Sequence, residues 1–170
     1  MQKNFLTFLL LLSNAVYAQK DSVQRYERPE NAIYAGFLGD ATLFSLNYES
    51  LTVLNDALIL SARLGFGFNE EFDLCLFGGC DEPDKYFVIP HHITINLGHR
   101  QSFFEAGLGG AYIPKLYAHP YYLFPMFGYR FIPVKETGPV LRFTIQVPVT
   151  GFELGPILFL PVGVSLGGSF

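Results

Sequence analysis

Five charged side chains fall on one face of strand-like alternating segments and could therefore do chemistry together. They are Glu49, Arg63, Glu105, Arg130 and Arg142. Side chains two residues apart on a β-strand point to the same side, and apolar residues occupy the other phase of these segments. Carboxylates and guanidinium groups on one inner face form ion pairs, or a proton or ligand site with shifted acidity.

Tight turns near residues 56, 100 and 136 decide which of these charges lie opposite one another. The first turn places Glu49 opposite Arg63, and the third places Arg130 opposite Arg142. Two facing arginines need carboxylates, and Glu105 on the neighbouring strand is the expected partner. The predicted result is a salt-bridged plug, because an eight-stranded interior has little room for a pore. A functional proton or ligand site is the alternative hypothesis.

His92 lies on the same inward phase, in the segment 86–98. It could act as a general base with Ser45 or Ser61 as the nucleophile, whereas the structural alternative is a hydrogen-bonded interior histidine. His91 points to the opposite face, so the two histidines cannot chelate one metal side by side. The sequence therefore predicts no metal site and no cofactor.

Cys75 and Cys80 lie five residues apart in the longest and most acidic connection, residues 69–85. In an exported chain such a pair is expected to form a small disulfide loop, and a metal site would need further ligands. The acids of this connection make it a solvated loop, or a site for a divalent cation or a surface partner. Their spacing matches no EF-hand pattern.

The elements that must position these residues are β-strands. Period-two alternation marks segments 42–50, 57–68, 86–98, 103–113, 123–134 and 140–149, and segments 32–38 and 158–170 complete a set of eight. Most approach the 9–11 residues of a tilted membrane strand, and short turns alternate with mostly longer loops. The predicted fold class is all-β, a closed antiparallel transmembrane up-and-down barrel. A soluble lipocalin-like barrel or sandwich is the alternative.

Composition and the start of the chain favour export. Residues 1–18 combine Lys3, a short apolar run and a Val-Tyr-Ala end, which is typical of a cleaved signal peptide. Residues 19–31 are predicted to be a short periplasmic tail and residues 32–170 the barrel. Half of the residues are hydrophobic and only 15% are charged, with a net charge of −4. Without a basic patch, nucleic acid is not an expected partner.

The signal, the Ser-Leu-Asn-Tyr-Glu strand at 45–49, the repeated alternation and the terminal Gly-Gly-Ser-Phe together carry a family resemblance. The chain resembles the small eight-stranded outer-membrane proteins of Gram-negative bacteria. The resemblance implies an outer-membrane location, contact with membrane lipid and lipopolysaccharide, and Phe170 as part of the signal read by the barrel-insertion machinery. It implies a structural or surface-interaction role. A lipid A-modifying hydrolase, whose His-Ser pair has no match here, and a narrow channel are the alternatives.

Overall fold

The computed structural model describes residues 28–70, 85–114, 120–149 and 159–170. In these residues the chain forms eight strands, which we number in chain order. They are β1 (Asn31–Phe37), β2 (Phe44–Asn55), β3 (Leu58–Glu70), β4 (Lys85–His99), β5 (Ser102–Tyr112), β6 (Tyr121–Phe131), β7 (Gly138–Gln146) and β8 (Val162–Ser169). No helix among the described residues is long and apolar enough to span a membrane.

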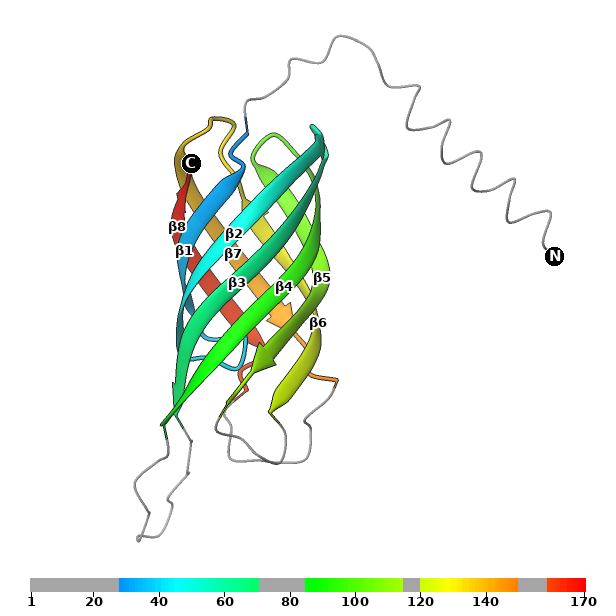
Figure 1. The fold of residues 1–170 in the computed structure, drawn as a ribbon. Coiled ribbons are helices and arrows are strands. Elements are labelled where there is room, and N and C mark those ends of the chain that lie inside the picture. The colour runs from blue at the N-terminus through cyan, green and yellow to red at the C-terminus, as the bar shows by residue number, and fades with distance from the viewer. Residues whose placement is uncertain (1–27, 71–84, 115–119, 150–158) are drawn as a thin grey trace, which may run out of the picture.

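The strands form a closed barrel in which each pairs antiparallel with its sequence neighbour and β1 pairs with β8 (Figure 1). Asn31 and Phe170 lie at the same end, which we call the termini end, together with the connections 56–57, 100–101 and 132–137. At the opposite end, the loop end, the connection 38–43 joins β1 to β2, and the strand ends there are Glu70, Lys85, Tyr112, Tyr121, Gln146 and Val162. The predicted closed, antiparallel, all-β fold is confirmed.

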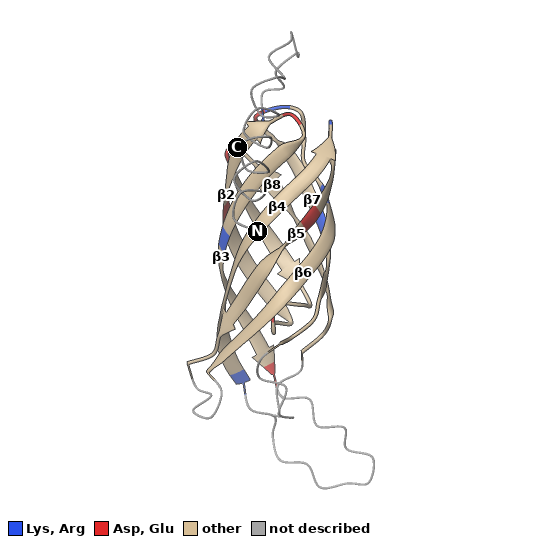
Figure 2. Ribbon diagram, turned by 90° about the vertical axis from the view of Figure 1, so that its right-hand side faces the viewer, with Lys and Arg blue, Asp and Glu red and all other residues tan. Residues whose placement is uncertain are grey.

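Alternation of side chains along the strands gives the barrel two different faces. In β2 the burial of successive residues alternates from Phe44 to Leu51, as a pleated strand requires. The outward face is apolar: Ile93 is 72% exposed, Leu64 60% and Phe66 57%. Charged residues are sparse along the strands in Figure 2. The face directed away from the interior is therefore the hydrophobic one.

The interior is arranged in three levels. At the loop end lies the mouth cluster, made of Ala41, Tyr86, Val88, Ala111, Ile113, Tyr122 and Phe124. At the termini end lies the base cluster, made of Leu51, Ile59, Phe103 and Ile132. Apart from Arg28 at the termini end, the buried charged side chains of the described residues occupy the level between them. Apolar packing at both levels excludes water from the charges in the middle.

The last strand begins later than its alternation predicts. It starts at Val162 rather than at 158, and Leu158 lies outside the described residues. Phe159 turns toward the mouth cluster, where its ring centroid is 5.6 Å from that of Phe124. Pro161 has no N–H to donate to a sheet ladder, so the regular pairing of β8 begins after it.

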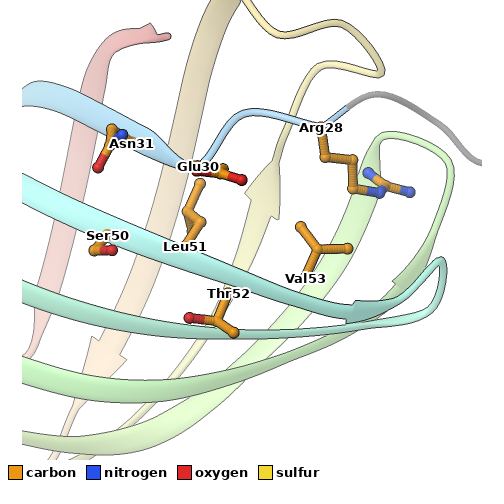
Figure 3. Close-up of a pocket in the computed structure, with 7 residues that line it drawn as sticks. All are labelled: Arg28, Glu30, Asn31, Ser50, Leu51, Thr52 and Val53. Carbon is orange, nitrogen blue, oxygen red and sulfur yellow. The ribbon is translucent and has the colours of Figure 1, made fainter.

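At the termini end, Arg28 lies across the entrance to the barrel. Its Nη1 donates to the carbonyl of Arg100 at 2.8 Å and its Nη2 to that of Asp56 at 3.1 Å. Its guanidinium also lies over the ring of Phe103. The segment before β1 is therefore hydrogen-bonded to the turns at 56–57 and 100–101. A pocket of about 430 Å³ lies between this segment and β2 (Figure 3).

Candidate functional site

All five charges predicted to lie inside the barrel are buried, and we call them the charge layer. Glu49, Arg63, Glu105, Arg130 and Arg142 are each at most 5% exposed. Their register is the predicted one: Glu49 is opposite Arg63, and Arg130 is opposite Arg142. The turns and the period-two alternation therefore place these residues at one level of the barrel. Which cation pairs with which carboxylate is determined by the side chains, as described next.

Arg130 and Glu49 form an ion pair across the lumen. Nη2 of Arg130 lies 2.7 Å from Oε1 and 2.8 Å from Oε2 of Glu49. The two residues belong to β6 and β2, which lie four positions apart in the ring of eight and therefore face each other. Neither side chain is more than 1% exposed, so the pair fills the middle of the barrel.

Arg142 and Glu105 form a second pair that bridges β7 and β5. Nε of Arg142 lies 2.6 Å from Oε2 of Glu105, and Nη2 lies 2.7 Å from Oε1. This two-point geometry is the strong form of the arginine–carboxylate interaction. Nε of Arg130 is 3.6 Å from the same Oε2. Glu105 thus lies next to both facing arginines, and its predicted role as their carboxylate partner is confirmed.

Arg63 does not take the partner that its register predicts. Nη2 of Arg63 forms an ion pair with Oδ2 of Asp40, and the carboxylate of Glu49 is bound by Arg130 instead. The predicted Glu49–Arg63 pairing is therefore wrong, although the backbone positions are right. Hairpin register fixes neighbouring Cα atoms, whereas long side chains inside a closed barrel reach strands on the far side.

Asp40 reaches the interior because the connection between β1 and β2 folds into the barrel. Four successive residues, Leu38, Gly39, Asp40 and Ala41, have φ values of 60°, 72°, 57° and 55°. This left-handed conformation is unusual for any residue but glycine. Thr42 closes the turn, its N–H donating to the carbonyl of Gly39 at 2.8 Å. Sequence reasoning predicted only a short connection here.

Gln146 holds the Asp40 turn from β7. The backbone N–H of Asp40 donates to Oε1 of Gln146 at 2.7 Å, and Nε2 of Gln146 donates to Oδ1 of Asp40. Burial by itself would raise the pKa of Asp40, but the charge of Arg63 and the contact with His92 outweigh burial and hold this pKa well below its usual range. Asp40 is therefore an ionised carboxylate inside the barrel.

His92 lies between this carboxylate and the arginines. Its Nε2 is 2.9 Å from Oδ1 of Asp40 and 2.6 Å from Nη2 of Arg63, and its Nδ1 is 3.4 Å from Nη2 of Arg142. The serines proposed as nucleophiles have other partners. Oγ of Ser45 accepts from Nδ2 of Asn47, and Oγ of Ser61 lies 2.6 Å from Oγ1 of Thr94. The structure therefore assembles no base–nucleophile pair from these three residues.

His91 lies on the outward face, as predicted. Its Nε2 is 2.7 Å from the hydroxyl of Tyr121, and its Nδ1 is 3.2 Å from the carbonyl of Ile89. Both ring nitrogens thus have partners on the outside of the barrel, away from His92. Among the described residues, no three His, Cys, Asp or Glu side chains gather as a metal site.

Apart from Arg28 at the termini end, the buried charges of the described residues balance. Arg63, Arg130 and Arg142 carry three positive charges, and Asp40, Glu49 and Glu105 carry three negative ones. Each of these three arginines has a carboxylate partner, although Nη1 of Arg130 and Nε of Arg63 have no hydrogen-bond partner. Such a network specifies one interior arrangement, because any unpaired charge at this depth is costly.

Phe170, the predicted insertion-signal residue, lies at the termini end. Phe170 is 53% exposed, and its backbone exchanges two hydrogen bonds with Asn31, of 2.9 and 3.1 Å. Cys75 and Cys80, with most of the acidic connection 69–85, lie outside the described residues. Their disulfide therefore stays a prediction.

Comparisons with known proteins gave no match: no family model, no curated protein and no solved structure corresponds to this chain. Its function is therefore inferred from geometry and physical chemistry alone.

Proposed function

We propose that the protein is an outer-membrane β-barrel with a sealed, ion-paired interior and a structural or surface-interaction role. The observation that carries the proposal is the inverted distribution of polarity. Large apolar side chains such as Ile93, Leu64 and Phe66 are exposed on the outward face, while the arginines and carboxylates are buried. In water this arrangement would leave an extensive apolar surface uncovered, whereas a bilayer requires it.

The height of the outward apolar band supports a membrane environment. On β6, Tyr121 and Tyr129 are exposed near opposite ends of the strand, with Leu123 and Phe127 between them on the same face. Eight residues of a strand tilted as in membrane barrels rise about 20 Å. This approaches the apolar band of about 25 Å that aromatic girdles flank in such proteins.

The polarity of the chain gives the proposed orientation. β1 begins and β8 ends at the end of the barrel where consecutive strands are separated by fewer residues, which is the periplasmic side in bacterial outer-membrane barrels. The signal-like residues 1–18 would bring the chain to the periplasm, and Phe170 would be presented to the insertion machinery. Outer-membrane lipid and lipopolysaccharide would then surround the outward face.

The sealed interior favours a structural role over a channel. The mouth cluster and the base cluster are apolar, and the Arg130–Glu49 pair crosses the lumen between them. Ion permeation would require breaking buried pairs. We expect no steady conductance from the purified protein in planar bilayers, and a stable open level would contradict the sealed interior.

An arginine scan of the outward face tests the membrane proposal. Ile93 lies near the middle of β4 and is 72% exposed. In phospholipid vesicles, Ile93→Arg should lower the free energy of unfolding by about 2–4 kcal/mol, while Tyr129→Arg, near one end, should cost about 0–1 kcal/mol. Urea titration of the reconstituted protein measures both.

The matched control is Ile93→Ala, which removes apolar contact without adding a charge. A water-facing barrel would accept arginine at both exposed positions within about 0.5 kcal/mol. Equal, small effects of the two arginines would therefore refute the membrane environment, whereas a cost that depends on depth supports it.

A further inference from the structure

The carboxylate of Asp40 is bound by groups from three different strands. Arg63 of β3 pairs with Oδ2, while His92 of β4 lies 2.9 Å from Oδ1. Gln146 of β7 donates to Oδ1 with its amide nitrogen. None of these three groups belongs to the turn that carries Asp40. The groups that bind the carboxylate are therefore built into the barrel wall, and the carboxylate is brought to them.

These groups form a preorganised site for an anion. The side chains of Arg63 and His92 are 2% and 1% exposed, and Gln146 is 1% exposed. Nε2 of His92 lies 2.9 Å from Oδ1 of Asp40 and 2.6 Å from Nη2 of Arg63, and Nδ1 lies 3.4 Å from Nη2 of Arg142. If the site were emptied, a buried arginine would lose its counter-charge.

The turn that delivers Asp40 adopts a conformation that L-residues avoid. Leu38, Asp40 and Ala41 all have positive φ, which brings the side chain close to the backbone. Such backbone strain persists only where surrounding interactions impose it. Here the contacts of Asp40 with Arg63, His92 and Gln146 act together with the burial of Ala41 and a 2.8 Å hydrogen bond from Nδ2 of Asn69 to the carbonyl of Ala41.

From these observations we infer that Arg63, His92 and Gln146 form a carboxylate-binding site at the loop end of the lumen, and that Asp40 is its tethered occupant. A ligand bearing a carboxylate would enter the site only when the turn 38–43 swings out. The turn is thus an autoinhibitory plug. The inference does not depend on the membrane proposal, because the site is internal to the barrel and can be tested in detergent micelles.

The test is chemical rescue of Asp40→Gly. Glycine accepts positive φ, so the variant empties the site without adding strain. Its melting temperature should fall below that of the wild type. Formate should then restore about half of the lost melting temperature or more, because a ligand that binds only the folded state stabilises it. Chloride at equal ionic strength should restore much less, and the wild type should not respond to formate.

Two further variants locate the effect. Asp40→Gly/Arg63→Met removes the main cation of the site and should lose the response to formate. Asp40→Asn keeps the site filled with a neutral side chain, so it should be destabilised and formate should not rescue it. If Asp40→Gly refolds poorly, its refolding yield replaces the melting temperature and should rise with formate but not with chloride.

Several outcomes would overturn the inference. An equal response to formate and chloride would show general salt stabilisation rather than a site. A formate response that survives Arg63→Met, or that Asp40→Asn shares, would place the binding elsewhere. Failure of Asp40→Gly to respond at all would make Asp40 a structural ion-pair partner only.

Discussion

Replacing Glu49 by glutamine should be among the most destabilising conservative changes in this chain. The substitution removes the charge from both contacts that Nη2 of Arg130 makes with Glu49, at 2.7 and 2.8 Å. Glu105 is 3.6 Å from Nε of Arg130 and is already bound at two points by Arg142. Arg130 is fully buried, so water cannot replace the lost partner. We expect a loss of about 3–5 kcal/mol in the free energy of unfolding.

A double-mutant cycle separates the ion pair from the individual residues. Arg130→Met should also be strongly destabilising, because it strands the carboxylate of Glu49. The double variant Glu49→Gln/Arg130→Met leaves no unpaired charge, so its loss should be smaller than the sum by about 2–3 kcal/mol. The assay is urea unfolding of the reconstituted barrel followed by far-ultraviolet circular dichroism, with the exposed Glu136→Gln as the control that changes stability by no more than about 0.5 kcal/mol.

A second double-mutant cycle, between Glu49 and Arg63, tests whether ion-pair partners follow hairpin register or cross the lumen. These residues are opposite each other in the register of β2 and β3, but their ion-pair partners are Arg130 and Asp40. Their coupling should therefore be clearly smaller than that between Glu49 and Arg130. If the Glu49–Arg63 coupling equalled or exceeded it, partner choice would follow hairpin register, and the cross-lumen pair would be refuted.

Two other predictions concern packing and pH. A Cβ added at Gly167 would lie 2.1 Å from the carbonyl oxygen of Ile33 across the β1–β8 seam, whereas one at Gly168 would meet only an oxygen 3.9 Å away. In denaturant titrations Gly167→Ala should therefore cost about 1–3 kcal/mol and Gly168→Ala about 0.5 kcal/mol or less; equal losses would contradict this packing. The pKa of Asp40 is lower in the folded barrel than in an unfolded chain, so its stabilisation is present above about pH 4 and lost as the pH falls below that value. The stability difference between the wild type and Asp40→Asn should shrink in unfolding titrations stepped toward low pH, and a constant difference would exclude this linkage.

Register and orientation could be predicted from the sequence because both depend on local rules. The alternation from Phe44 to Leu51 assigns each residue to a face, and a tight turn then fixes which residue lies opposite which. These two facts placed Glu49, Arg63 and Glu105 inside the barrel and close to one level. No knowledge of the closed barrel was needed for that step.

The partners of the charges could not be predicted, because they depend on closure. Arg130 reaches Glu49 only when β6 and β2 face each other across the lumen, and hairpin register carries no information on that distance. Asp40 escaped prediction for a related reason: the Gly39-Asp40 step signals a turn but not a turn that folds inward. The start of β8 was misplaced because the alternation continues before Pro161, where the chain leaves the sheet.

The distribution of buried charge restricts where this protein can act. In the middle of the barrel, Nη2 of Arg130 contacts both oxygens of Glu49, and Arg142 binds Glu105 through two nitrogens. Apolar clusters lie on both sides of these pairs. An anionic ligand there would have to displace Glu49 or Glu105. Both carboxylates are fixed on strands of the closed sheet, so neither can move out of the lumen. Asp40 differs because it sits on a six-residue connection, residues 38–43, rather than on a strand. In the proposed carboxylate site, its withdrawal would not require opening the barrel, which places the binding chemistry that we infer at the loop end.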